Sequence, residues 1–282
     1  MNAAPLDEKT RKLEAILRDA EGVLVAFSAG ADSTLLACVA HRVLGPRALA
    51  VTGRSVTLAR AELDEATALA RRIGIRHRIV DTEEINDPSF GNNPPNRCYF
   101  CKDELYSILR RVAEEEGLPV IADGSNADDL GDHRPGMQAA REREVRSPLM
   151  EAGLTKEEIR RLSKALGLPT WDKPAQACLS SRFPYGDRIT PGKIAQVERA
   201  EAALRELGFR QLRVRHHGTI ARIEIPRGEI PSLFARGLAE EAVRRVKEAG
   251  FTYIALDLEG FRSGSMNEVL RAPGPSGLPL LP

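Results

Sequence analysis

One segment near the N-terminus constrains the fold more than any other, because a short apolar strand passes directly into a loop of small residues and then into a helix. The apolar run Gly22–Ser28 predicts the strand, and the loop reads S-A-G-A-D-S over residues 28–33. A helical pattern over Asp32–Leu44 and a second strand at Ala48–Thr52 follow. Two strands joined through a helix form a parallel, right-handed βαβ unit, so the sequence predicts an α/β domain.

The same alternation of helices and strands continues along the chain. The patterns predict helices at Leu58–Ile73 and Tyr99–Glu116, and strands at Ile75–Val80 and Leu118–Asp123. We therefore expect a doubly wound, mostly parallel sheet with helices on both of its faces.

The rest of the chain predicts a smaller α+β domain. A helix at Lys156–Leu166 is followed by a proline-rich connection, Leu168–Asp187, which we expect to be ordered but not helical. Beyond it the patterns indicate a helix, two strands, a helix and a strand, at Pro191–Leu207, Gln211–His216, Ile220–Ile225, Leu238–Ala249 and Tyr253–Leu258. The predicted divisions of the chain are residues 1–187, residues 188–271 and a flexible tail, residues 272–282.

Composition argues against several classes of protein. Forty-one basic and forty acidic residues give a net charge of +1 without a long run of one sign, so neither a nucleic-acid arm nor a polybasic membrane patch is indicated. No run of about 18 apolar residues predicts a membrane span. Four cysteines are too few for a disulfide scaffold in 282 residues. We expect a cytoplasmic protein whose cysteines bind metal, carry redox or nucleophilic chemistry, or are simply buried.

The loop after the first strand is suited to binding phosphate. Free N–H groups and the positive end of the helix dipole favour an anion, and serine hydroxyls add donors. The same residue types also serve as ordinary helix caps, and the Gly-Lys-Ser/Thr ending of a Walker loop is absent. The loop resembles the S-x-G-x-D-S PP-loop of the N-type ATP pyrophosphatases, which implies that Ser28, Gly30, Asp32 and Ser33 hold the phosphates of ATP. Many members have glycine where this chain has Ala29, for which we expect a negative φ.

Two further segments are associated with ATP by the same resemblance. The segment Asp123–Asp129 follows a predicted strand and so lies at the carboxyl edge of the sheet, where open α/β sheets bind ligands. A similar stretch lies by the nucleotide in PP-loop enzymes, which implies roles for Gly124 and Asn126. Its acidic residues could orient Mg2+, although solvated loop aspartates are at least as common. Thr52 and Arg54 follow the second strand, where the family approaches the adenosine.

Two cysteines lie close together at the start of a predicted helix. The segment N-R-C-Y-F-C-K at residues 96–102 places Cys98 and Cys101 on one side of the first turn, where the helix dipole, Arg97 and Lys102 stabilise thiolates. Such a pair alone is ambiguous among half of a zinc site, a redox dithiol and two buried small residues.

The other two cysteines have contrasting surroundings. Cys178 lies in an irregular, polar segment bounded by prolines, whereas Cys38 falls among the leucines of the first helix and is expected in the core. Three convergent thiolates, from Cys98, Cys101 and Cys178, suit an iron–sulfur cluster with one iron left without a protein ligand. Without a cluster, Cys178 is the candidate nucleophile or sulfur donor.

Taken in order, these segments resemble the LarE family of ATP-dependent sulfur transferases in nickel-pincer nucleotide biosynthesis. The resemblance covers nearly the whole chain and is most specific at N-R-C-Y-F-C-K, at P-A-Q-A-C-L-S-S-R-F-P-Y-G over residues 174–186 and at D-L-E-G-F-R-S-G-S-M-N over residues 257–267. It implies adenylation of the carboxylates of pyridinium-3,5-biscarboxylic acid mononucleotide and their conversion into thiocarboxylates. Some members sacrifice the sulfur of the cysteine that matches Cys178, whereas members with all three cysteines assemble a 4Fe-4S cluster. The resemblance therefore implies ATP, Mg2+ and a 4Fe-4S cluster as cofactors.

The substrate of that family is a small anionic nucleotide, so arginines near the third cysteine are candidate ligands. The residues that the sequence suggests for substrate or phosphate binding are Arg97, Ser181, Arg182, Arg213 and Arg215. The resemblance places an acidic residue of the preceding helix, Glu201, near a bound metal. Without the resemblance, the preferred interpretation of Arg213, Arg215 and Glu201 is an exposed sheet face and a solvated helix side.

Three other functions stay open at this point. A tRNA thiolation enzyme would also combine a PP-loop with three cysteines, although the near-neutral charge makes nucleic acid an unexpected partner. An amide-forming ligase related to NAD or GMP synthetase would share the loop without needing thiols, and a regulatory nucleotide-binding protein would leave ATP intact. The family resemblance further implies a homo-oligomer, and the source of sulfide is not indicated by the sequence.

Overall fold

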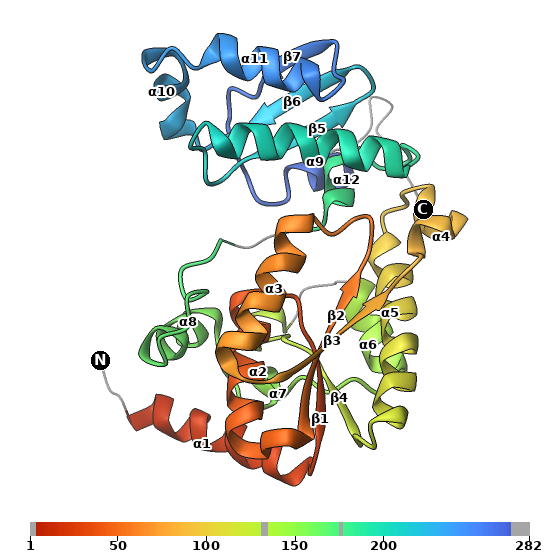
Figure 1. The fold of residues 1–282 in the computed structure, drawn as a ribbon, viewed down its shortest axis with the longest axis vertical. Helices are drawn as coiled ribbons and strands as arrows, with labels where there is room; N and C mark the ends of the chain where they lie inside the picture. The colour runs from red at the N-terminus through yellow and green to blue at the C-terminus, as the bar shows by residue number, and fades with distance from the viewer. Residues whose placement is uncertain (1–3, 131–134, 175–176, 272–282) are drawn as a thin grey trace. The chain divides into compact units, whose positions relative to one another are not determined.

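The chain forms two compact units in the computed structural model, which describes residues 4–130, 135–174 and 177–271 (Figure 1). The first unit comprises Met1–Phe90 and Asn96–Gln176, and the second comprises Gly91–Pro95 and Ala177–Pro282. The chain thus crosses from one unit to the other three times. The tail predicted to be flexible, residues 272–282, lies outside the described residues.

A parallel sheet of four strands, in the order β3-β2-β1-β4, forms the centre of the first unit. Its strands are β1 (Val23–Ala26), β2 (Ala48–Arg54), β3 (Arg76–Asp81) and β4 (Val120–Ala122). Strand β1 lies between β2 and β4, with Val23 opposite both Ala48 and Val120. An uninterrupted apolar run is expected of a parallel strand that is covered on both faces, which explains the sequence of β1. The predicted α/β fold is confirmed.

Helices cover both faces of this sheet (Figure 1). Five helices contribute to the core on one face: α1 (Ala4–Asp19), α2 (Ala31–Leu44), α3 (Arg60–Ile73), α7 (Pro148–Glu151) and α8 (Lys156–Ala165). Two helices, α5 (Arg97–Glu115) and α6 (Pro135–Glu142), contribute to the core on the other face. A single turn, α4 (Pro88–Gly91), precedes α5. The sequence patterns did not indicate α1, α4, α6 or α7.

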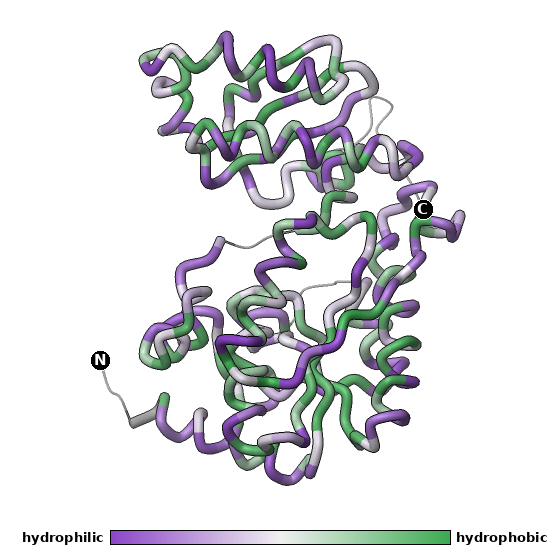
Figure 2. Tube along the Cα trace, viewed as in Figure 1, coloured by the Kyte–Doolittle hydropathy of each residue, from purple (hydrophilic) through white to green (hydrophobic). Residues whose placement is uncertain are grey.

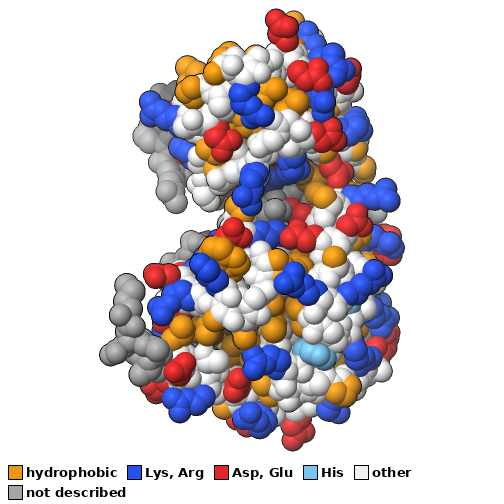
Figure 3. All heavy atoms as spheres, turned by 60° about the vertical axis from the view of Figure 1, so that its left-hand side comes forward, with side chains coloured by type: hydrophobic (Ala, Val, Ile, Leu, Met, Phe, Trp, Pro, Cys, Tyr) orange, Lys and Arg blue, Asp and Glu red, His pale blue; other side chains and the backbone are white. Residues whose placement is uncertain are grey.

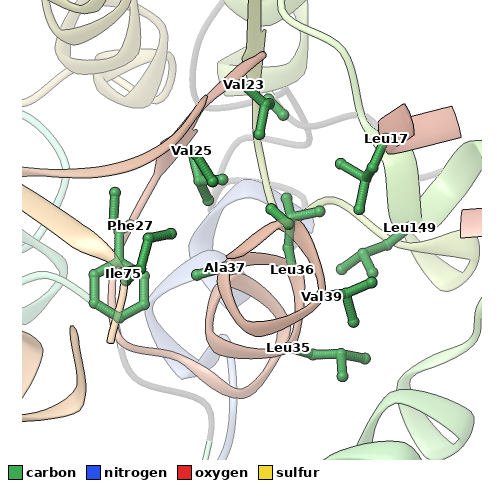
Figure 4. Close-up of a cluster of buried hydrophobic side chains, with 14 of the residues drawn as sticks. Leu17, Val23, Val25, Phe27, Leu35, Leu36, Ala37, Val39, Ile75 and Leu149 are labelled. Carbon is green, nitrogen blue, oxygen red and sulfur yellow. The ribbon is translucent and has the colours of Figure 1, made fainter. Parts of the chain in front are cut away.

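Alternate residues of β1 divide between the two cores. Val23, Val25 and Phe27 belong to the core with α2, and Figure 4 shows them facing Leu36 and Ala37 of that helix. Leu24 belongs instead to the core formed with α5 and α6. In Figure 2 the apolar residues of the first unit are concentrated along β1, β2 and β4, whereas the edge strand β3 is largely hydrophilic. The strand is therefore held from both sides, and its carboxyl end has a fixed position.

The second unit is a sheet of three strands with helices. Strands β5 (Arg213–His217) and β6 (Ile220–Glu224) are antiparallel, and β7 (Tyr253–Leu256) runs parallel to β6. Its helices are α9 (Pro191–Glu206), α10 (Ile230–Ala235), α11 (Ala239–Glu248) and α12 (Glu268–Arg271), of which α10 and α12 were not predicted. His216 contacts Gln196 of α9, so Arg213 and Arg215, which alternate with it, lie on the opposite face of β5.

A short segment that precedes α5 completes the second unit. The buried amide of Asn93 donates to the carbonyl oxygens of Phe183 and Pro184, at 3.3 and 2.6 Å. The backbone N–H of Ile189 donates to the carbonyl of Gly91 at 2.8 Å. These bonds explain why the second unit begins at Ala177, earlier than the predicted boundary after residue 187. The connection Leu168–Asp187 lacks an α-helix in its described part and contains one 3-10 turn, η4 (Leu179–Arg182).

Surface charge is mixed in sign. On the face drawn in Figure 3, Lys and Arg side chains alternate with Asp and Glu and do not gather into one basic patch. Among the helices that the structure describes, none has the length and apolar character needed to span a bilayer.

Candidate active site

The PP-loop joins β1 to α2 and leaves the first turn of that helix open to an anion. Gly30 is the N-cap residue of α2, and no side chain caps the helix there. The hydroxyls of Ser28 and Ser33 lie 3.1 Å apart, and the Ser33 hydroxyl also accepts from the backbone N–H of Ser28 at 3.3 Å. These contacts shape the loop around the helix N-terminus, where backbone N–H groups and the helix dipole attract phosphate.

The backbone of Ala29 differs from the expectation. Its φ is +54°, in the left-handed region, whereas the sequence led us to expect a negative value. The chain must turn sharply between the buried strand and the helix, and a glycine would adopt this conformation without the steric cost of about 1–2 kcal/mol that a Cβ carries. The Ala29 side chain is fully buried, and its carbonyl accepts from Lys173 Nζ at 3.0 Å. Surrounding contacts therefore maintain a strained residue in the middle of the loop.

The loop after β4 lies against the PP-loop, as the sequence predicted. A Cβ placed on Gly124 would lie only 3.0 Å from the backbone nitrogen of Ser33, so the two loops touch through a glycine. The side-chain amide of Asn126 donates to Asp32 Oδ1 at 3.4 Å, and Lys156 forms an ion pair with the other carboxylate oxygen. Asp32 is therefore held on both oxygens at the start of α2.

The acidic residues of that second loop accept hydrogen bonds from the loop's own backbone and from neighbouring segments. Asp123 accepts from the Ser125 backbone, the Ser147 hydroxyl and the Tyr106 hydroxyl, at 3.1, 2.8 and 3.2 Å. Asp129 accepts from the backbone of Asn126 in a capping box.

Thr52 and Arg54 have different environments. The buried Thr52 hydroxyl donates to the Phe27 carbonyl at 2.8 Å and lies 2.9 Å from His77 Nε2, so it links three neighbouring strands. Burial lowers the pKa of His77 and keeps that ring neutral. Arg54 is exposed and forms a two-bond ion pair with Asp81. Of the two, Arg54 is the one whose side chain is accessible to a ligand.

Helix α5 presents the cysteine pair at its first turn. Cys98 is exposed and Cys101 is half-buried, and neither is in a disulfide. Helix α6 approaches this turn closely, since a Cβ on Gly136 would lie 3.2 Å from Lys102 Cγ and 3.7 Å from the Cys98 carbonyl. Burial opposes the charge of Lys102, but Tyr106 and Asp123 outweigh it and raise the pKa of its ammonium. A positive charge is therefore favoured one residue after Cys101, where it favours the thiolate. Cys38 is half-buried against the core, as predicted, and burial raises the pKa of its thiol.

The third thiol belongs to the second unit. Cys178 is exposed and begins the turn η4. The guanidinium of the buried Arg182 donates to the carbonyl of Cys178 at 2.9 Å and to that of Ala177 at 2.6 Å. The same nitrogen lies 3.0 Å from the Ser181 hydroxyl. Arg182 therefore fixes the backbone of the cysteine turn.

Glu201 is the centre of a buried charge network. The sequence alone favoured a solvated position, but its side chain is fully buried. It binds Arg182 through two hydrogen bonds of 2.8 and 2.9 Å, and also accepts from Arg205 and from the backbone of Val214. Burial alone would raise the pKa of Glu201, but the Arg182 charge and these hydrogen bonds lower it. The carboxylate is therefore ionised and holds the Cys178 turn through Arg182.

The two arginines of β5 are buried as well, and not on an exposed sheet face. Arg215 donates to Glu224, to Ser265 and to the Ser181 carbonyl, at 2.7, 3.0 and 2.9 Å. Arg213 stacks over the Phe261 ring at 5.2 Å. Burial, together with the neighbouring charge of Arg182, lowers the pKa of Arg213 to about 10. A group with excess positive charge nearby gains stability when an anion binds.

Sequence reasoning missed Glu224, Lys156 and Lys173. Glu224 lies opposite Arg213 in the register of β5 and β6, which only the pairing of the strands reveals. Ser265 falls within the D-L-E-G-F-R-S-G-S-M-N motif, so the sequence marked this segment. The motif did not show that Ser265 contacts Glu224. Within the parts of the chain that the structure describes, no three His, Cys, Asp or Glu side chains are grouped closely enough to hold a metal ion.

Comparison with known proteins agrees with this geometry. The family model for NAD synthase matches residues 9–113, which include the PP-loop. The chain is 41% identical, over 95% of its length and 96% of the relative, to the pyridinium-3,5-bisthiocarboxylic acid mononucleotide synthase of Lactiplantibacillus plantarum. It is 48% identical, over 94% of its length and 99% of the relative, to an uncharacterized protein of Synechocystis. A tRNA-specific 2-thiouridylase of Rickettsia africae is 27% identical over 54% of this chain and 52% of its own length. With its PP-loop, its cysteines and this similarity along nearly all of its length, the chain belongs to the LarE family of PP-loop enzymes, which are ATP-dependent sulfurtransferases.

Proposed function

We propose that this enzyme converts carboxylates of pyridinium-3,5-biscarboxylic acid mononucleotide into thiocarboxylates in nickel-pincer cofactor biosynthesis. The observation that carries the proposal is the similarity to the Lactiplantibacillus plantarum synthase along nearly the whole chain, combined with three cysteines outside disulfides, Cys98, Cys101 and Cys178. In the first step a substrate carboxylate attacks the α-phosphate of ATP, and pyrophosphate leaves. In the second step hydrosulfide attacks the activated carbonyl, the bond to AMP breaks, and a thiocarboxylate remains.

The first step uses residues of the first unit. The N-terminus of α2 and the hydroxyls of Ser28 and Ser33 bind the departing pyrophosphate, because their N–H and O–H groups satisfy its oxygens. PP-loop enzymes bind ATP with Mg2+, and Asp32 is the carboxylate at the loop that is suited to orient the metal. Gly124, Asn126, Thr52 and Arg54 then border the nucleotide.

The donor set of the cysteines fits a 4Fe-4S cluster. Cys98 and Cys178 are exposed and Cys101 is half-buried, so each sulfur is a thiol outside the hydrophobic core, unlike Cys38. Three thiolates would hold three of the four irons. When bound, such a cluster supplies a site at which exogenous sulfide is kept available as a nucleophile. The helix N-terminus at Cys98 and the ammonium of the half-buried Lys102 favour the thiolate forms that ligation requires.

The second unit supplies the positive charge that an anionic substrate needs. Arg213, with its lowered pKa, and Arg215 lie on the same face of β5, and Arg182 links that region to the Cys178 turn. A phosphate or carboxylate of the substrate would compensate the excess of positive charge around Arg213. Ser181 and Arg97 are further candidate ligands. Glu201 binds three partners within the network, so we assign it to holding Arg182 and regard metal binding by Glu201 as secondary.

The proposal includes a cytoplasmic location, a homo-oligomeric state and no nucleic-acid partner. The mixed charge of the face drawn in Figure 3 supports the last of these, since a tRNA-binding enzyme needs a basic surface for the phosphate backbone.

The test is anaerobic purification followed by quantification of iron and acid-labile sulfide in the wild type and in Cys98→Ala. The proposal expects bound iron in the wild type, its loss in Cys98→Ala, and repeated turnovers with added sulfide, ATP and substrate. Mass spectrometry of Cys178 after turnover distinguishes the sacrificial route. A wild type that binds no iron and loses one sulfur at Cys178 would show that the sulfur comes from the protein. Modification of tRNA instead of the small nucleotide, or intact ATP, would overturn the proposed function itself.

A further inference from the structure

The PP-loop itself carries no basic side chain. Residues 28–33 read S-A-G-A-D-S, so the formal charge that the loop contributes is the negative charge of Asp32. The pyrophosphate that leaves ATP is a polyanion, and the partial positive charge of about one half at the N-terminus of α2 compensates only a fraction of it. We therefore expect another segment of the chain to supply a cation to this site.

Two ammonium groups lie at this loop in the part of the chain that the structure describes. Lys173 donates to the Ala29 carbonyl at 3.0 Å and pairs with Glu65 at 2.7 Å, and its side chain is only 12% exposed. Lys156 pairs with Asp32 at the start of α2, and its side chain is 34% exposed. Of the two, Lys156 has the ammonium that a ligand of the loop can reach more easily.

The backbone of Lys156 is fixed by contacts that do not involve its ammonium. Lys156 is the first residue of α8, and its N–H donates to Asp128 Oδ2 at 2.8 Å. The preceding Thr155 caps the helix and forms a capping box with Glu158. The start of α8 is therefore attached to the second nucleotide loop, Asp123–Asp129, whichever partner the ammonium has.

The ammonium of Lys156 has donors to spare. Among the described residues, Asp32 is its one hydrogen-bond acceptor, whereas an ammonium has three N–H groups. An ion pair that is partly exposed to water is weak, so little stability is lost when the ammonium turns toward another anion. Hydrogen bonds from an ammonium to phosphate oxygens are charge-assisted and strong.

We propose that Lys156 is a catalytic residue of the first step, whose ammonium binds the pyrophosphate that leaves ATP. The inference rests on the ATP cleavage of the proposed function and extends it to a residue outside the PP-loop. Asp32 holds the ammonium at the loop in the free enzyme. When ATP is cleaved, the bond between the α-phosphorus and the bridging oxygen breaks, and its electron pair stays on the pyrophosphate. The ammonium stabilises that developing charge.

Binding of pyrophosphate alone to the full-length protein, measured by calorimetry without Mg2+, tests the inference. Lys156→Met should weaken this binding about tenfold or more, since a charged hydrogen bond is lost, and leave AMP binding within about threefold. Lys156→Arg should recover part of the loss. Lys156→Met should also slow the substrate-dependent formation of AMP at saturating ATP about tenfold or more.

Lys9→Met is the matched control. Lys9 also pairs with a carboxylate, that of Glu158 in α8, and not with a residue of the PP-loop. The exposed fractions of the two side chains are 32% and 20%, against 34% and 20% for Lys156 and Asp32. Lys9→Met should bind pyrophosphate like the wild type, and the two lysine variants should unfold at similar temperatures.

A second pair of variants separates direct binding from neutralisation of Asp32. If Lys156 only cancels the charge of Asp32, its loss has no effect on pyrophosphate binding once that charge is absent. Asp32→Asn and the double variant Asp32→Asn/Lys156→Met should still differ about tenfold or more, because the ammonium contacts the anion itself. Equal affinities of these two variants would overturn the inference.

The remaining outcomes distinguish this inference from the proposed function. Unchanged pyrophosphate binding in Lys156→Met would overturn the role of Lys156, as would a parallel loss of pyrophosphate binding, AMP binding and thermal stability. A wild type that binds pyrophosphate through Lys156 but leaves the carboxylates of the pyridinium nucleotide unchanged would refute the proposed substrate, and the assignment of Lys156 would stand.

Discussion

A single alanine shows how the PP-loop differs in this chain. Ala29 keeps a positive φ although only glycine adopts it freely, so the surrounding contacts overcome a local steric cost. Ala29→Gly should relieve that cost. Ala31→Gly, at the first position of α2, should only raise the conformational entropy of the unfolded chain and so lower stability. We expect Ala29→Gly to be more stable than Ala31→Gly by about 1 kcal/mol in urea denaturation. Equal stabilities would contradict the strained conformation.

Loss of the Glu201 charge should strongly destabilise the second unit. Glu201→Gln removes the charge between Arg182 and Arg205 and leaves buried cations without compensation. We expect a loss of about 3–5 kcal/mol in the free energy of unfolding, measured by denaturant titration. Glu241→Gln is the matched control, since Glu241 also binds two arginines but at the surface, where water screens the charges and little should change.

The stability that Glu201 provides should also depend on pH. Its pKa in the folded state is lowered from 4.5, so the carboxylate stabilises the fold fully above that value. The contribution is lost as the pH falls through the lowered folded pKa. The difference in stability between wild type and Glu201→Gln should therefore be constant near neutral pH and shrink in acid. A difference that grows on acidification would contradict this assignment.

At the scale of elements, the contact between two loops predicts a specific sensitivity. Gly124→Ala would place a Cβ 3.0 Å from the backbone nitrogen of Ser33, and backbone at the start of α2 cannot move aside without distorting the PP-loop. We expect ATP to bind about tenfold more weakly, a change that corresponds to about 1.4 kcal/mol, as measured by calorimetry. Gly192→Ala is the control, because nothing lies within 4 Å of a Cβ there. Unchanged ATP binding in Gly124→Ala would separate this loop from the nucleotide site.

The sequence predicts the elements that form the central sheet because their patterns are local. The strand–loop–helix of β1 and α2, and the helices α3, α5 and α9, were predicted with ends displaced by a few residues. Helix α6 (Pro135–Glu142) was not among the predicted elements. The burial of Arg215 and Glu201 could not be predicted, since it depends on partners distant in sequence, such as Glu224 for Arg215 and Arg182 for Glu201. Charged residues are mostly exposed unless paired, and pairing is a property of the fold.

At the scale of the whole molecule, the segment Gly91–Pro95 interrupts the first unit in the sequence but belongs to the second unit. Asn93 is fully buried and its amide binds two carbonyls of the segment after Cys178. Asn93→Ala should lower the free energy of unfolding by about 1–3 kcal/mol, because a buried and a half-buried carbonyl lose their donor. Asn92→Ala, one residue earlier and exposed, should change stability by less than about 0.5 kcal/mol. Similar thermal denaturation of the two variants would show that the Gly91–Pro95 segment does not stabilise the second unit.

The candidate site as a whole could be predicted only as a set of parts. Motifs identified the PP-loop, the cysteine pair and the Cys178 segment, because each is a continuous stretch with its own chemistry. The structure adds the contacts that join such stretches, including Lys173 to Ala29 and Arg182 to Cys178. Each of these contacts joins a charged side chain to a backbone carbonyl, for which a sequence carries no periodic signal.

The interleaving of the two units limits how the gene can be divided. A cut at residue 176 would leave Gly91–Pro95 attached to the N-terminal piece, while the carbonyls that Asn93 binds would go with the C-terminal piece. Anyone who wishes to express the ATP-binding half by itself must also replace residues 91–95 with a linker from Phe90 to Asn96. Anyone who wants the other half must graft that pentapeptide onto it.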